Sequence, residues 1–264
     1  MSVSDDLRQL IDGSGHNFHA RVARWFVDNG WEVTISPYYM DQSHQKAREV
    51  DLVAEWVLPD KRRRPRGLGI GNYDVGVRLF IECKFVPSLT VFWFAKKKRD
   101  NARRLVSAEG QFPSDPREIV VHHYLDESLR VAKLFQTKSH KGGQAMSEQQ
   151  DPFYKALNQV LHASFAMQGR AGDASFGGKV PNTVLEFPVI VCGGFDQLYR
   201  VDFFGEGEQE PEKINKNFQL EVQYAYHGSP NEYRLIDVVD IDRLDAFQQS
   251  IVQDAMTAYE FNRY

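Results

Sequence analysis

The chain has 264 residues, of which 42% are hydrophobic and 26% are charged, and its formal net charge is -4. This composition is typical of a globular protein, and the negative charge excludes a chain that is polycationic as a whole. The two cysteines, Cys83 and Cys192, lie in apolar runs, so they indicate buried thiols and exclude a disulfide scaffold or a cysteine zinc site.

No apolar run approaches the ~18 residues that a membrane-spanning helix needs. Residues 1–6 are polar and acidic, unlike a signal peptide. We therefore expect a cytoplasmic protein without a membrane partner.

The first elements read in chain order as one helix and three strands. Residues 17–29 place apolar side chains at helical spacing, and Gly30 is suited to end the helix. Three strand-like segments follow, over residues 31–39, 48–57 and 77–86.

A second region is more irregular. Residues 59–76 hold a basic run and several glycines, which is typical of a flexible connection. We expect a helix from about residue 95 to 108, a short strand over 119–123 and a polar loop over 136–151. On such a strand His122 and His123 would point to opposite faces, so joint metal binding is not expected.

The remaining elements are clearer. Residues 153–168 form an amphipathic helix, strands are expected over 184–192, 198–204, 219–226 and 233–239, and a helix over 241–259 closes the chain. The pattern predicts one α/β domain spanning residues 1–264, with insertions at about 59–76 and 92–150.

Charged residues stand at unusual places in two of these strands. Glu82-Cys83-Lys84 ends an apolar run, and Glu49-Val50-Asp51 begins another. Alternation along a strand places Glu82 and Lys84 on one face of their strand. It likewise places Glu49 and Asp51 on one face of theirs, and Val50, Leu52 and Ala54 on the opposite face. A buried charge is tolerated when it is paired or binds a metal. If the strands are neighbours, three carboxylates and one ammonium converge in a site suited to a hard divalent cation.

These motifs resemble the PD-(D/E)xK nucleases, the restriction-endonuclease-like phosphodiesterases. Asp51 matches the first acidic position and Glu82-Cys83-Lys84 matches the E-x-K signature, while Val50 replaces the usual proline. Glu49 fits a Glu-x-Asp version of the motif. The resemblance implies an αβββαβ core, in which helices flank a mixed sheet, followed here by C-terminal strands and the closing helix.

The same resemblance implies roles for single residues. Asp51, Glu82 and the backbone carbonyl of Cys83 would bind Mg²⁺, for which Mn²⁺ can substitute, and Glu49 would serve a second ion or one of its waters. Lys84 would contact the scissile phosphate or orient the attacking water. Two further residues would complete the site: His19, where relatives often carry a glutamate, and Gln159 on the later helix, near Lys155.

Basic residues flank the E-x-K strand in sequence and suit a phosphate backbone. They form two patches, one with Arg62, Arg63 and Arg64 and the other with Lys96, Lys97 and Lys98. We therefore expect a nuclease that acts on nucleic acid, with DNA favoured and RNA left open. The resemblance implies restriction, repair or defence as its setting. We also expect a homodimer or an activating partner, because many enzymes that cut both strands of a duplex pair two active sites.

Two other interpretations stay open. In the first, the chain is a nucleic-acid-binding module that has lost catalysis, an interpretation motivated by His19 in place of an acidic residue. Alternatively it is an interaction subunit whose E-x-K is an ion pair, with residues 91–94 (Val-Phe-Trp-Phe) as a partner-facing patch instead of core.

Overall fold

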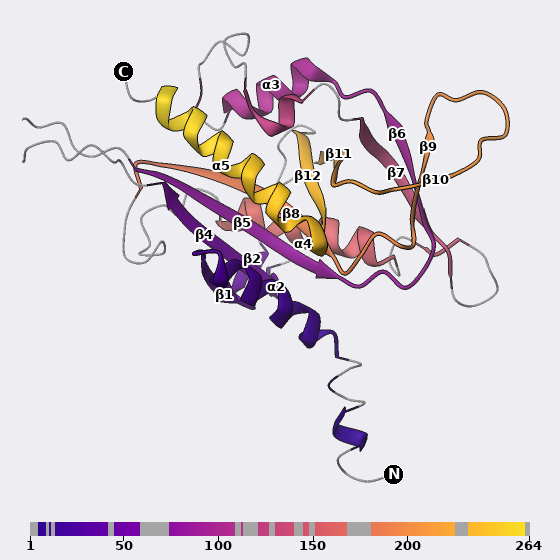
Figure 1. Ribbon diagram of the computed structural model, residues 1–264, viewed down its shortest axis with the longest axis horizontal. Helices are drawn as coiled ribbons and strands as arrows, with labels where there is room; N and C mark the ends of the chain where they lie inside the picture. Colours follow the sequence, from indigo (N-terminus) through magenta and orange to yellow (C-terminus); the bar gives the residue numbers. More distant parts are fainter. Residues whose placement is uncertain are drawn as a thin grey trace, which may run out of the picture.

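The computed structural model describes residues 5–8, 11, 14–41, 45–58, 74–108, 112, 121–126, 130–139, 145–147, 151–167, 181–224 and 232–261. It shows a mixed α/β protein in which helices flank one large mixed sheet (Figure 1). Among the described residues this sheet has ten strands, in the order β1-β4-β5-β8-β12-β11-β7-β6-β9-β10.

The strands of the large sheet have the following bounds: β1 Glu32–Ile35, β4 Leu52–Leu58, β5 Val75–Lys84, β6 Thr90–Ala95, β7 Val131–Thr137, β8 Thr183–Cys192, β9 Leu198–Asp202, β10 Glu212–Lys213, β11 Phe218–Tyr224 and β12 Glu232–Asp240. A separate two-stranded sheet joins β2 (Tyr38–Asp41) to β3 (Lys46–Glu49).

The centre of the large sheet carries the strand with the E-x-K motif. β5 pairs antiparallel with β4, with Leu52 opposite Ile81, and parallel with β8, with Lys84 opposite Cys192. β5 reads Val-Gly-Val-Arg-Leu-Phe-Ile-Glu-Cys-Lys, and nine of its ten residues are buried. A strand covered on both faces is expected to be almost continuously apolar, so its three charged residues need special partners.

In the described part of the chain the sheet is covered by four helices: α2 (His16–Asp28), α3 (Arg99–Ala108), α4 (Pro152–Met167) and α5 (Leu244–Phe261). α5 crosses the near face in Figure 1, and α4 lies behind the sheet. The apolar side chains accordingly form two cores. One joins α2, α3 and α5 to Leu79 and Ile81, and the other joins α4 to Phe80 and Ile190. The alternation predicted along β5 is thus confirmed.

The predicted strands over 31–39 and 48–57 are each divided in two. Ser36 has a positive φ of 51°, which ends β1 before β2 begins. Val50 packs in the α4-side core although Leu52 and Ala54 pack in the opposite one. The prediction that Val50 shares their face is therefore wrong, because the alternation breaks at Asp51, between β3 and β4.

The region after β5 also differs from expectation. Residues 90–95 form β6, which has an irregularity between Trp93 and Phe94, and α3 begins at Arg99 instead of residue 95. Phe92 and Phe94 are buried whereas Val91 and Trp93 are partly exposed, so two of the four residues belong to the core. β7 was not predicted. Its parallel pairing with β11 and antiparallel pairing with β6 tie this region to the main sheet.

Where a strand was expected over 119–123, the described residues instead enter a short 3-10 helix, η2 (His123–Leu125). The later elements α4, β8, β9, β11, β12 and α5 agree with their predicted positions to within a few residues. None of the helices in the described part of the chain is long and apolar enough to cross a membrane.

Candidate metal centre

The antiparallel pairing of β4 and β5 brings the two acidic motifs together. Since Leu52 lies opposite Ile81, the preceding Asp51 comes beside Glu82. The backbone N–H of Cys83 donates to Asp51 Oδ2 at 2.8 Å, and the backbone N–H of Asp51 donates to Glu82 Oε1 at 3.3 Å. Each carboxylate is thus fixed by the other motif's backbone.

Two nitrogen-bearing side chains complete the cluster. Lys84 Nζ lies 2.9 Å from Glu82 Oε2 and 3.9 Å from Asp51 Oδ2, so it lies between the two carboxylates. His19, on α2, places Nε2 3.5 Å from the same Asp51 oxygen. The structure therefore brings Asp51, Glu82, Lys84 and His19 together, as expected if the two strands are neighbours.

Burial sets the charge state of this cluster. It raises the pKa of the fully buried Glu82 to about 7, even though Lys84 favours the ionised form. Burial also lowers the pKa of His19, with Asp51 acting in the opposite direction, so the ring is largely neutral at pH 7. For Lys84 burial lowers the pKa, but Glu82 and Asp51 outweigh it and the net shift is upward. Two carboxylates and one ammonium give a site that can accept further positive charge.

Glu49 lies at the end of β3, outside the strand that follows Asp51. Its carboxylate accepts a hydrogen bond from the Tyr38 hydroxyl, which raises the pKa of that tyrosine. The charge of Glu49 still acts on His19. The prediction that Glu49 and Asp51 lie on one continuous strand is therefore wrong. Glu49 lies at the edge of the cluster, opposite Tyr38 in the pairing of β2 with β3.

Gln159 and Lys155 lie on α4. The backbone carbonyl of Gln159 accepts a 3.2 Å hydrogen bond from the Tyr39 hydroxyl, while its side chain is half-buried. Glu82 and desolvation both act to raise the pKa of Tyr39. Gln159 thus borders the cluster through Tyr39, and Lys155 is exposed.

Of the two basic patches, the structure describes the one formed by Lys96, Lys97 and Lys98. Arg62, Arg63 and Arg64 lie outside the described residues. Lys96 and Lys98 are exposed before α3, but Lys97 points inward and donates to the backbone carbonyl of Tyr124 at 2.8 Å. Burial lowers the pKa of Lys97 to about 8. Two lysines of this patch therefore face solvent, and one is tied to the protein.

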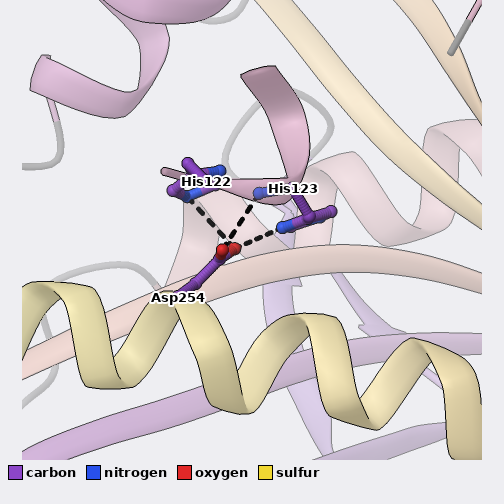
Figure 2. A group of neighbouring side chains, drawn as sticks. All are labelled: His122, His123 and Asp254. Carbon is purple, nitrogen blue, oxygen red and sulfur yellow. Dashed lines mark hydrogen bonds and ion pairs between the residues drawn. The ribbon is translucent and has the colours of Figure 1, made fainter. Parts of the chain in front are cut away.

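A second group of polar residues was not foreseen as a site. His122 and His123 both face Asp254 of α5 in Figure 2, because the chain turns into η2 at this point. Their rings stack at a centroid distance of 5.0 Å. The expectation that they point to opposite faces is wrong. Asp254 lies 131 residues beyond His123, and no local sequence pattern connects them.

Comparison of the chain with protein-family models, with curated proteins and with solved structures found no match.

Proposed function

We propose that the protein is a metal-dependent phosphodiesterase of the PD-(D/E)xK type that hydrolyses nucleic acid, with DNA as the more favoured substrate. The observation that carries this proposal is the convergence of Asp51, Glu82 and Lys84 at one end of β4 and β5. Oxygen ligands at a site rich in negative charge suit Mg²⁺ or Mn²⁺.

The residues present fit such an ion. Glu82 is fully buried with a pKa near 7, and a carboxylate in that state gains when a cation takes the place of its proton. Asp51 is 8% exposed, and its Oδ2 faces the backbone N–H of Cys83, Nε2 of His19 and Nζ of Lys84. His19, largely neutral, can offer Nε2 as a further ligand.

Each side chain then has a distinct task. A bound divalent ion would polarise the phosphate and lower the pKa of a water molecule. Asp51 and Glu82 would hold the ion, and Lys84 would move from between them toward the negatively charged phosphate. There its ammonium would neutralise charge that grows as the phosphorus–oxygen bond breaks. His19, on α2, would add its ligand beside Asp51.

The order of elements also supports the proposal. α2, β1, β4, β5, α4 and β8 follow one another as helix, three strands, helix and strand, interrupted by the β2-β3 hairpin and by β6, α3 and β7. In the sheet β1, β4, β5 and β8 are consecutive neighbours. The αβββαβ core implied by the motif resemblance has this order.

The test is cleavage of supercoiled plasmid and of single-stranded DNA, with Mg²⁺, with Mn²⁺ and with chelator. Glu82→Gln and Lys84→Met should each lower the rate at least about 100-fold, since each removes a charge that acts on the transition state. The matched control is Glu212→Gln, which removes an exposed carboxylate paired with Arg200 and should cut at the wild-type rate. Metal-independent cutting, or full activity of both site variants, would refute the proposal.

A second function is favoured by one observation, the histidine at the helix position. If His19 marks lost catalysis, the protein binds nucleic acid without cutting it, and binding needs no divalent ion. Salt-dependent binding of the same DNA in chelator, together with no cleavage in Mn²⁺, would support this second function over the first.

A further inference from the structure

A buried polar cluster lies on the face of the sheet opposite Glu82. Asp237 of β12 lies between Leu235 and Val239, which pack in the core with α5, whereas Glu82 shares its face with Phe80 and the α4-side core. Asp237 is 4% exposed and Asp254 of α5 is 1% exposed. Buried carboxylates need positively charged partners, and here they meet His123.

His123 is held from three sides. Its backbone N–H donates to Asp254 Oδ1 at 2.9 Å, and its ring Nδ1 is in close contact with Asp254 Oδ2. Its other ring nitrogen, Nε2, lies 3.1 Å from Asp237 Oδ2. Asp254 thereby fixes the ring and leaves Nε2 directed at Asp237.

Among the residues that the structure describes, one buried oxygen next to this cluster has no hydrogen-bond partner. Gln219 of β11 lies opposite Asp237 in the strand register and is 2% exposed. Its Nε2 donates weakly to Asp237 Oδ1 at 3.4 Å, but its Oε1 accepts no hydrogen bond from any described residue. A buried oxygen without a partner costs free energy, which a bound cation would remove.

A cavity of about 340 Å³ is bordered by His123, Asp237 and Gln219, and it is also lined by Asp126, Phe247 and Ser250. The cavity therefore gives a small ion a route to these three residues. This access distinguishes the cluster from a fully enclosed ion pair.

We propose that His123 Nε2, Asp237 Oδ2 and Gln219 Oε1 bind a Zn²⁺ ion, with an open position toward the cavity. Ligands about 2.0 to 2.1 Å from a tetrahedral ion lie about 3.3 Å apart, close to the 3.1 Å between His123 and Asp237. Asp254, which holds Nδ1, is the outer carboxylate that commonly orients a metal-bound histidine. An imidazole ligand favours Zn²⁺ over Mg²⁺.

His122 is excluded as a ligand by its own hydrogen bond. Its Nδ1 accepts the backbone N–H of Tyr124 at 3.0 Å, so the neutral ring carries its proton on Nε2. That Nε2 lies 3.4 Å from Asp254 Oδ2 and carries the ring proton, so it has no lone pair to offer a metal ion. Although His122, His123 and Asp254 could enclose an ion by distance, the Zn²⁺ position therefore lies on the Asp237 side of His123.

The alternative occupant of that position is a proton. Burial opposes protonation of His123, but Asp237 and Asp254 outweigh it and raise its pKa to about 10. Zn²⁺ must therefore displace this proton to bind His123. A direct titration measures the affinity for Zn²⁺ that remains after this competition.

The experiment is titration of the metal-stripped full chain with Zn²⁺ alone, followed by calorimetry and by metal analysis after gel filtration. Three variants test the site: Asp237→Asn and Gln219→Leu, which remove ligands while keeping shape, and Asp254→Asn, which removes the outer carboxylate. Glu82→Gln, on the other face, controls for Zn²⁺ held at the proposed nuclease site, so failure of one site is distinguished from failure of the other.

We expect wild type and Glu82→Gln to retain one equivalent of Zn²⁺ in this site. Asp254→Asn should weaken binding by 10- to 100-fold, in line with outer carboxylates elsewhere. Asp237→Asn and Gln219→Leu should also lose affinity, and circular dichroism shows which variants remain folded. The proposal fails if Glu82→Gln retains no Zn²⁺, or if folded Asp237→Asn and Gln219→Leu bind as tightly as wild type.

Discussion

Two buried charge clusters share the strands β4 and β5, and they are built differently. At one end Arg78 donates to Glu55 at 2.7 Å and to Glu186 at 2.9 Å, so a single guanidinium serves two carboxylates through separate nitrogens. At the other end Lys84 bonds Glu82 at 2.9 Å but lies 3.9 Å from Asp51. A planar guanidinium can satisfy two carboxylates at once, while an ammonium acts as a point charge.

The comparison distinguishes a structural cluster of charges, formed by Arg78, Glu55 and Glu186, from a candidate metal site that uses the same strand β5. The charges of the Arg78 cluster are fixed by directional hydrogen bonds in the sheet. Burial raises the pKa of one carboxylate in each cluster, Glu186 beside Arg78 and Glu82 beside Lys84. The Glu82 cluster differs because its cation is a single ammonium and because a largely neutral histidine, His19, lies beside it. A perturbed carboxylate next to an imidazole is typical of functional sites.

The largest expected difference concerns stability. Arg78→Met should lower the free energy of unfolding by about 3–5 kcal/mol, because it leaves Glu55 and Glu186 buried without their cation. Lys84→Met at pH 6 should cost about 1 kcal/mol or less, because Glu82 takes up a proton instead of remaining charged. Urea unfolding of both variants measures the contrast, and equal losses would show that the two clusters are alike.

The next effect is the pH dependence of stability without metal. The folded pKa of Glu82, about 7, lies above its ordinary 4.5, so its contribution is full below pH 4.5 and is lost as the pH rises through 7. This difference corresponds to about 3 kcal/mol at most. Unfolding curves of wild type and Glu82→Gln between pH 4.5 and 8 should therefore diverge, with wild type losing more stability. Parallel curves would contradict the raised pKa.

His19 should have a smaller effect. His19→Ala removes a ligand that lies 3.5 Å from Asp51, and we expect the Mn²⁺ midpoint for cleavage to rise about tenfold, or about 1.4 kcal/mol. The matched control is His16→Ala on the exposed surface of the same helix. If both variants respond equally to Mn²⁺, His19 plays no part in the metal site.

The smallest expected effect concerns the salt dependence of DNA binding by Lys96, Lys97 and Lys98. Two of these lysines face solvent, and Lys97 is bonded to the protein. Lys96→Ala and Lys98→Ala should each reduce the slope of log affinity against log salt by about 0.7 to 0.9, if each lysine contacts one phosphate. Lys97→Met should leave this slope unchanged, because its ammonium bonds the backbone carbonyls of Tyr124 and Asp126. Binding of a fluorescent DNA at several salt concentrations gives the three slopes.

The two-residue period of a strand predicted that Glu82 and Lys84 share a face, whereas the position of Asp51 depends on the pairing of β4 with β5, which the sequence left as a condition. The sequence did not predict that the segments 31–39 and 48–57 are divided at Ser36 and Asp51. The φ of 51° at Ser36 is a conformation that this residue type does not signal. The sequence also missed β7, whose burial does not alternate regularly.

The Asp237–His123–Asp254 cluster depends on contacts between residues more than 100 positions apart. Such contacts follow from the order of strands and from the placement of α5 across the sheet. Local patterns carry no signal for either, so the cluster was beyond prediction from the residues alone.

The central claim is that the Glu82 end of β5 is arranged for a divalent cation and the Arg78 end is not. The most direct test is Mn²⁺ binding followed by electron paramagnetic resonance, for wild type, Glu82→Gln and Glu186→Gln. We expect wild type and Glu186→Gln to bind Mn²⁺ alike and Glu82→Gln to bind it at least tenfold more weakly. Equal binding by all three proteins, or none by wild type, would contradict the claim.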